Sequence, residues 1–226
     1  MRRRVEQAAA VAQALFPPGA EVAACAIGKA PPPWPSEAPA VAAAVPARQA
    51  EFAAGRAAVR AALDALGLPP VAVPVGPTRA PAWPAGIVGS ITHSDGLALA
   101  VLAPARQCAG LGFDAEPDAP FPADLVESVT RPEERRWLAA QPEPLTAARM
   151  IFVAKEAAYK CQFPASRAVI GFDALRIGFA GNGRVEAVFA IPVPPFAVGD
   201  RLHGRVTRGA GLLMAGFSRA AQASLA

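Results

Sequence analysis

The chain has 226 residues, of which 53% are hydrophobic, and this length fits one large domain or two small lobes. Its 22 lysine and arginine residues exceed its 18 aspartate and glutamate residues by four, which suits an anionic small molecule or an acidic protein partner. Aromatic residues make up only 7% and do not alternate with the arginines, so we expect no nucleic-acid-binding surface. No stretch approaches the roughly 20 apolar residues that cross a membrane, so we expect no membrane insertion.

The cysteines are few and widely separated, and no two form a CxxC pair: Cys25, Cys108 and Cys161. This pattern indicates neither a disulfide framework nor a zinc site, and it favours a reducing cytoplasm. The arginine- and alanine-rich start of the chain imitates a signal peptide, but Glu6, Gln7 and Gln13 interrupt its apolar run and a Pro-Pro-Gly turn follows. We therefore predict a short amphipathic helix there.

Proline and glycine divide the first half into elements. Residues 21–27 are apolar and predict a short strand, while the proline-rich residues 31–39 predict a loop. Residues 46–66 place apolar side chains at helical spacing between Pro46, which suits a helix start, and Gly67, which suits a helix end. Strands are predicted after this helix at residues 71–75, 86–90, 97–102 and 109–115.

The second half repeats the order of helix followed by strands. Helical turns are predicted at residues 122–129 and 132–140, and a long helix over residues 145–161. Strands are predicted beyond it, near Leu175 and at residues 185–190, 202–207 and 212–217. We therefore expect an α+β protein of two lobes, residues 1–113 and 114–226, with the functional site in the cleft between them.

Two carboxylates end an apolar segment in the middle of the chain. Asp114 and Glu116 are two residues apart, so on a strand both side chains project from the same face. Their mutual repulsion is explained if a hard cation lies between them, because one or two carboxylates together with substrate phosphates form the usual magnesium site. A solvated strand end, followed by Pro117 and Asp118, remains an alternative.

A second cluster lies within the long predicted helix. Glu156 and Lys160 are four residues apart and share a helix face, which by itself is typical of an exposed ion pair. However, only three of the 22 basic residues are lysines, and two of these, Lys155 and Lys160, lie around Glu156. Arginine would serve an exposed surface equally well, so the pattern favours a site that needs a compact ammonium group.

One of the two histidines lies in the sequence Gly-Ser-Ile-Thr-His-Ser at residues 89–94. His93 is either a ligand contact at the junction of a strand and a loop or a histidine that a turn satisfies.

The helix at residues 46–66 carries a stripe of arginines at multiples of four residues: Arg48, Arg56 and Arg60. The stripe is either a solvated helix face or a set of phosphate clamps, because a guanidinium group presents paired donors to phosphate oxygens. Arg79, in a loop between predicted strands, is a further candidate for phosphate binding.

Taken in chain order, these motifs resemble the 4′-phosphopantetheinyl transferase superfamily, and within it the stand-alone bacterial members that activate siderophore and other nonribosomal peptide synthetases. The similarity spans about half of the chain, from Arg48 with Gly55-Arg56, through residues 89–94 and 112–116, to residues 152–160. Ala115 and Val153 depart from the family pattern, and neither is a candidate ligand.

The resemblance implies a pseudo-twofold α+β fold with coenzyme A, the co-substrate, between the lobes. The Mg²⁺ ligands that it implies are Asp114, Glu116 and Glu156. The catalytic residues are Glu156 and Lys160, the latter near the pyrophosphate. The implied coenzyme-binding residues are Arg48, Arg56, Arg79, His93, Lys155 and Lys160, with His93 at the 3′-phosphate and the role of Lys155 left open.

The implied reaction is the transfer of 4′-phosphopantetheine to a serine of an apo acyl or peptidyl carrier protein, with release of adenosine 3′,5′-bisphosphate. Glu156, directly or through a water, is expected to accept the serine proton. We expect the protein to work as a monomer. Because oxygen ligands accept both Mg²⁺ and Mn²⁺, the choice between these two metals stays open.

Two alternatives remain open on the residues alone. A non-catalytic module that binds coenzyme A or a nucleotide would need the arginines and His93 but not all three acids.

For the carrier protein, Arg131, Arg135 and Arg136 near Trp137 offer a basic docking surface, and a solvated helix face explains them equally well.

Overall fold

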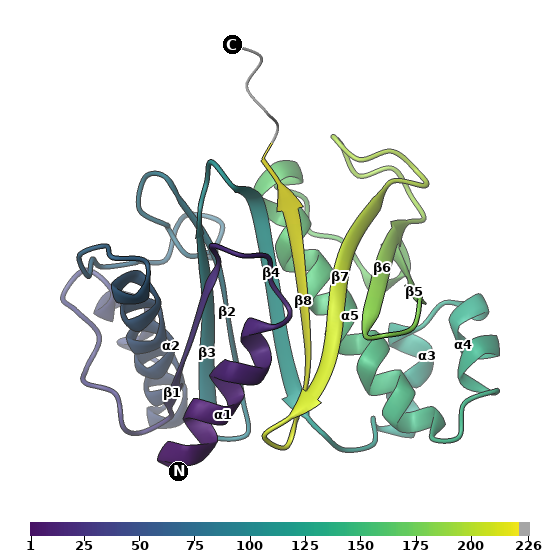
Figure 1. Ribbon diagram of the computed structural model, residues 1–226, viewed down its shortest axis with the longest axis horizontal. Helices are drawn as coiled ribbons and strands as arrows, with labels where there is room; N and C mark the ends of the chain where they lie inside the picture. The colour runs from purple at the N-terminus through teal and green to yellow at the C-terminus, as the bar shows by residue number, and fades with distance from the viewer. Residues whose placement is uncertain (222–226) are drawn as a thin grey trace.

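The chain folds into two antiparallel sheets that lie side by side (Figure 1). The computed structural model describes residues 1–221. The first half contains α1 (Arg2–Gln13), β1 (Glu21–Ala26), a 3-10 turn (Ala38–Val41), α2 (Pro46–Ala65), β2 (Ile87–Ser94) and β3 (Leu97–Pro104). Because β3 pairs with both β1 and β2, the order of strands in this sheet is β1-β3-β2.

The second half forms a larger sheet with the strand order β4-β8-β7-β6-β5. Its elements are β4 (Cys108–Pro117), a 3-10 turn (Ala123–Leu125), α3 (Val126–Val129), α4 (Pro132–Leu138), α5 (Pro144–Ser166), a 3-10 turn (Phe172–Ala174), β5 (Leu175–Phe179), β6 (Arg184–Phe189), β7 (Arg201–Gly209) and β8 (Leu212–Ala220). The prediction of an α+β fold is confirmed.

Alternation along β3 and β4 assigns the two faces of the sheets to different helices. One face packs against α1, through Leu97, Leu99, Val101, Leu111, Phe113 and Ala115. The opposite face of β3 packs against α2, and the second sheet packs against α5, which lies behind it in Figure 1. Asp114 and Glu116 alternate with the residues that face α1, so they project toward α5.

Most predicted elements are present with shifted ends, because element boundaries are the least certain part of a sequence pattern. The strand predicted at residues 86–90 continues to Ser94, so His93 is the second-last residue of β2, just before the turn to β3. The helix predicted at residues 145–161 runs from Pro144 to Ser166. Among residues 1–221, no helix is both long and apolar enough to cross a membrane.

The strand predicted at residues 71–75 is wrong. The segment has no regular strand and makes a single bridge, between Val75 and Pro81. Val73 is nevertheless fully buried, and its N–H donates to a carboxylate oxygen of Glu37 at 2.9 Å. The apolar run therefore reflects burial beneath a loop, which periodicity cannot distinguish from burial within a sheet.

The pairing of strands changes sheets between Pro104 and Cys108, because β3 belongs to the first sheet and β4 to the second. The expected division into residues 1–113 and 114–226 falls inside β4 and stays a prediction. The helix α1 contacts β1 of the first sheet and β7 and β8 of the second, so it bridges both halves.

Candidate active site

Two hydroxyl side chains join β2 to β4 where the two sheets meet. Ser90 and Thr92 are two residues apart, so both point from β2 toward β4. The Phe113 N–H donates to Ser90 Oγ at 3.0 Å, and Thr92 Oγ1 donates to Asp114 Oδ1 at 3.0 Å. Both hydroxyl residues are buried. These two hydrogen bonds fix the position of Asp114 relative to the first sheet.

Glycine lets β4 approach α5 unusually closely. A Cβ atom on Gly112 would lie 1.8 Å from the Ala157 carbonyl oxygen and 2.6 Å from the Cys161 nitrogen, so only glycine fits there. This contact sets the face of α5 that carries Lys160 directly against β4. Lys160 Nζ donates to Asp114 Oδ1 at 2.7 Å and to the Phe113 carbonyl at 3.1 Å.

Three carboxylates share the partly buried space between β4 and α5. Burial raises the pKa of Glu156, and the nearby Asp114 raises it further while Lys160 opposes the change. Burial also raises the pKa of Glu116, again with a contribution from Asp114, and the Arg149 guanidinium opposes it. Arg149 donates to Glu116 Oε2 at 3.1 Å and to the carbonyls of residues 119 and 120. These acids repel one another, as their spacing in the sequence predicts.

A cation fits this arrangement chemically. The Asp114 Oδ2 atom is buried and has no hydrogen-bond partner within the described part of the chain. A buried carboxylate oxygen without a partner is costly unless a donor or a cation reaches it. Among residues 1–221, no three acidic, histidine or cysteine side chains converge closely enough to hold a metal ion by themselves. Substrate phosphates and water would therefore have to complete the coordination, as is usual for Mg²⁺.

A basic cluster surrounds His93, the residue that follows Thr92 on β2. Arg48 Nη1 lies 2.7 Å from His93 Nε2 and donates to Glu51 Oε2 at 3.0 Å. Because a guanidinium group can only donate, His93 Nε2 accepts and the imidazole is neutral. Burial lowers the pKa of His93, Arg48 and Lys160 lower it further, and Glu51 opposes the change.

The arginine stripe of α2 is exposed at Arg48 but becomes buried at Arg56 and largely buried at Arg60. Arg56 is only 4% exposed and lies over the Phe52 ring at 4.2 Å, and among residues 1–221 its Nε has no hydrogen-bond partner. Burial lowers the pKa of Arg56 to about 10, an effect that Glu37 opposes. A buried guanidinium with a free donor favours an anionic ligand. Arg48, Arg56, Arg79 and His93 all line one cavity of about 200 Å³.

A second cavity continues from the basic one toward the carboxylates. It has a volume of about 310 Å³, and its walls include Trp83, Tyr159 and Lys160. Arg79, Pro81 and Ile91 line both cavities, so the two adjoin. Together they form a path from the basic cluster on α2 to the ammonium group of Lys160.

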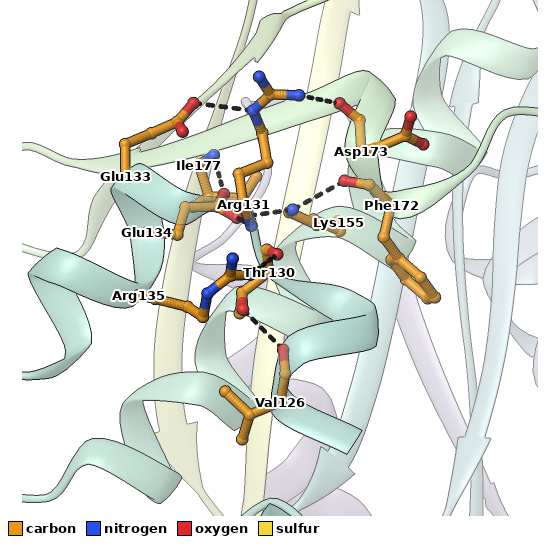
Figure 2. A network of polar contacts seen from close by, with 10 residues as sticks. All are labelled: Val126, Thr130, Arg131, Glu133, Glu134, Arg135, Lys155, Phe172, Asp173 and Ile177. Atoms are coloured by element: carbon orange, nitrogen blue, oxygen red, sulfur yellow. Dashed lines mark hydrogen bonds and ion pairs between the residues drawn. The ribbon is translucent and has the colours of Figure 1, made fainter. Parts of the chain in front are cut away.

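Lys155 is the predicted site residue that the structure places elsewhere (Figure 2). Its ammonium group donates to Glu134 Oε2 at 2.7 Å and to the Phe172 carbonyl at 2.8 Å. Both Lys155 and Glu134 are 2% exposed. The backbone N–H groups of Arg131 and Ile177 complete the bonds to Glu134. This internal pair removes Lys155 from the candidate coenzyme contacts.

The same network affects the candidate docking arginines. Arg131 bonds to Glu133 and to the Asp173 carbonyl, and Arg135 donates to the Thr130 carbonyl at 2.7 Å. Two of the three arginines therefore bond within their own chain, whereas Arg136 is exposed.

Sequence reasoning missed several residues that shape the site. Ser90 and Thr92 lie inside a motif that we noted for its histidine, and their spacing of two was the signal for a shared face. Glu51 lies three residues after Arg48, which is the spacing of a helical ion pair. Arg149 and Glu37 gave no local signal, because each acts on a segment distant in the sequence.

Comparison with known proteins identifies the class to which this fold and site belong. Residues 36–103 match the 4′-phosphopantetheinyl transferase N-terminal domain, and residues 110–203 match the 4′-phosphopantetheinyl transferase superfamily. The chain belongs to this superfamily, and its activity is that of a 4′-phosphopantetheinyl transferase, a holo-carrier-protein synthase. The resemblance that the motifs gave is confirmed, and the non-catalytic binding module is set aside.

Individual relatives align with most of the chain. It is 39% identical over 201 residues to the 4′-phosphopantetheinyl transferase Svp of Streptomyces mobaraensis, covering 85% of this chain and 81% of that protein. It is 38% identical over 166 residues to Npt of Nocardia iowensis, covering 70% and 75%. Enterobactin synthase component D of Salmonella typhi is 37% identical over 132 residues, covering 58% and 54%.

Proposed function

We propose that coenzyme A binds along the two adjoining cavities, with its nucleotide phosphates at the basic cluster and its pyrophosphate beside Asp114 and Lys160. Arg48, Arg56 and Arg79 would pair with the nucleotide phosphates, and His93 would contact the 3′-phosphate. The observation that carries this proposal is the continuous lining from the arginines to Lys160, because Arg79, Pro81 and Ile91 belong to both cavities.

Asp114, Glu116 and Glu156 would contribute ligands to Mg²⁺, and substrate phosphates and water would complete the coordination that these carboxylates do not provide by themselves. The unpartnered Asp114 Oδ2 and the raised pKa values of Glu116 and Glu156 support this assignment, because a cation relieves the repulsion among buried carboxylates. When bound there, Mg²⁺ would supply positive charge that offsets the negative charge gathering on the leaving group.

The protein's own residues would orient and activate the reacting groups. The carrier serine Oγ forms a bond to the β-phosphorus while the bond from that phosphorus to the bridging oxygen breaks, and adenosine 3′,5′-bisphosphate leaves with the electron pair. Lys160 would stabilise the charge on the phosphate oxygens. Glu156, directly or through a water, would accept the serine proton.

The acceptor is an apo carrier protein, and we infer that it belongs to a peptide synthetase or a related assembly line. Support comes from the similarity to a protein named enterobactin synthase component D. An acidic carrier helix would complement the excess of four basic residues. We propose that the enzyme acts as a monomer in the cytoplasm.

Intact-mass analysis of apo carrier proteins incubated with the enzyme, coenzyme A and Mg²⁺ tests the proposal. We expect one phosphopantetheine on the carrier serine, lost when a chelator is added and restored by excess Mg²⁺. Arg48→Ala should raise the KM for coenzyme A about tenfold, because it removes a charged contact. Transfer that persists in chelator would refute the metal assignment, and an unchanged KM would refute the placement of the coenzyme.

A further inference from the structure

Glu37 is the most enclosed carboxylate beside the basic cavity. It is 1% exposed and lies in the proline-rich segment before α2. Its Oε1 accepts the N–H of Val73 and its Oε2 accepts the N–H of Trp34, each at 2.9 Å. Arg60 Nη1 donates to both oxygens, at 3.1 and 3.2 Å. One carboxylate therefore joins two loops to the helix that carries the arginine stripe.

The bond to Val73 determines where the wall of the cavity lies. Residues 71–75 have no sheet neighbour at Val73, and the carboxylate of Glu37 supplies the acceptor that a strand would otherwise supply. The segment leads directly into Val75 and the loop with Arg79, and both residues line the basic cavity. Arg79 has a left-handed backbone conformation, with φ of 65°, so the loop depends on fixed flanks.

Glu37 also supplies negative charge to the two less exposed arginines of the stripe, Arg56 and Arg60. Arg60 is stacked over the Trp34 ring at 4.8 Å, and Arg56 lies one turn away on the same face of α2. Arg56 Nε and Arg60 Nη2 have no hydrogen-bond partner in the described residues. Without Glu37, two desolvated guanidinium groups would repel each other beside the cavity.

We propose that Glu37 is a positioning residue for coenzyme A: it holds residues 71–75 and the Arg79 loop against α2 and keeps Arg56 and Arg60 in place. Glu37 does not touch the coenzyme and acts through Arg56, Arg60 and Arg79. The inference rests on the proposed placement of coenzyme A in the basic cavity.

The test compares Glu37→Gln with a matched control, Glu134→Gln. The glutamine side chain has one oxygen where the carboxylate has two, so it can accept a hydrogen bond from only one of the two backbone N–H groups. The other N–H group would face the NH₂ group of the amide. Glu134 is equally buried, and its oxygens likewise accept two backbone N–H groups and a cation, from Arg131, Ile177 and Lys155. Both variants should lose stability. Only Glu37→Gln should raise the KM and the calorimetric Kd for coenzyme A, by about tenfold with kcat within about twofold.

The outcomes separate this inference from the placement of the coenzyme. If Arg48→Ala weakens coenzyme A binding and a folded Glu37→Gln does not, the role of Glu37 is refuted and the cavity stands. If Arg48→Ala has no effect, the placement itself fails. An equal rise in KM for Glu134→Gln would reduce Glu37 to a general contribution to stability and overturn the proposal.

Hydrogen exchange on the unmodified enzyme decides the question if Glu37→Gln does not fold. The Val73 amide should exchange slowly without coenzyme A although it lies outside any sheet, and excess coenzyme A should extend protection into residues 76–79. Exchange of Val73 at the rate of an unstructured peptide, or no change in residues 76–79 on adding coenzyme A, would overturn the proposal.

Discussion

At the scale of single residues, the candidate site brings together carboxyl groups whose burial disfavours their charged form. Asp114 Oδ1 accepts hydrogen bonds from Thr92 and Lys160, whereas Oδ2 is buried and has no hydrogen-bond partner in residues 1–221. Glu156 lies in the same desolvated space, and its raised pKa has burial as its largest cause. Perturbed acids in a cleft are typical of catalytic sites.

Glu156→Ala should abolish transfer, lowering kcat by about three orders of magnitude, because it removes a proposed metal ligand and the proposed proton acceptor. Far-ultraviolet circular dichroism should show an intact fold, and coenzyme A should still bind. Glu186→Ala is the control: it removes a carboxylate on β6 that pairs with Arg201 at the surface, and it should retain activity. Full activity in Glu156→Ala would contradict the assignment.

The stability of the coenzyme-free enzyme should depend on His93 near neutral pH. Burial holds its pKa below the ordinary value of 6.5, with Arg48 and Lys160 adding to the effect and Glu51 and Asp114 opposing it. The unfolded chain therefore takes up the proton first as the pH falls, so this contribution is present above pH 6.5 and is lost below it. Between pH 7.5 and 5.5, the midpoint temperature of thermal unfolding should fall more steeply for the wild type than for His93→Gln. Parallel curves would contradict this prediction.

At the scale of elements, the contact between β4 and α5 brings the acids and Lys160 together. It depends on Gly112, where a Cβ atom would overlap the Ala157 carbonyl. The buried pair of Lys155 and Glu134 joins α5 to α4, and it also joins β5, because the Ile177 N–H donates to Glu134 Oε1. The motif in α5 therefore has a structural member, Lys155, and two members, Glu156 and Lys160, that lie near Asp114.

Gly112→Ala should destabilise the protein by about 3 kcal/mol, because α5 must move away from β4 to admit the methyl group. The same movement should lengthen the contact between Lys160 and Asp114 and reduce transfer. Gly178→Ala is a suitable control, because the nearest atom to its added Cβ, Arg176 Nη1, lies 3.9 Å away. Urea unfolding of both variants measures the difference, and equal stabilities would contradict the role given to Gly112.

At the scale of the whole molecule, α1 lies across both sheets (Figure 1). Arg4 on this helix donates to the carbonyl and carboxylate of Asp95, in the turn between β2 and β3. It also donates to the Ala210 carbonyl, in the turn between β7 and β8, at 2.9 Å. One guanidinium group therefore connects a turn of each sheet.

Arg4→Ala should lower the free energy of unfolding by about 1–2 kcal/mol, because it removes charge-assisted hydrogen bonds that link the two sheets. Arg2→Ala is the control on the same helix: its partner is Glu6 and its side chain is 94% exposed, so the change should stay within about 0.5 kcal/mol. Urea denaturation monitored by tryptophan fluorescence measures both variants. A loss for Arg4→Ala no larger than that for Arg2→Ala would contradict the link.

The sequence by itself determined the local elements and the reacting groups. Periodicity, proline and glycine predicted α2, α5 and most strands, because these signals act within one turn or one strand. The spacing of Asp114 and Glu116, and of Glu156 and Lys160, predicted which side chains share a face. The order of the motifs predicted the family.

Only the tertiary structure decided which of these groups meet. Lys155 and Glu156 are adjacent in the sequence, yet Lys155 enters the core with Glu134 while Glu156 lies near Asp114. Residues 71–75 are apolar like a strand, yet Glu37, distant in the sequence, replaces the missing sheet neighbour. Long-range partners of this kind leave no periodic signal, because a buried carboxylate is chosen by the three-dimensional arrangement of donors around it rather than by its neighbours in the chain.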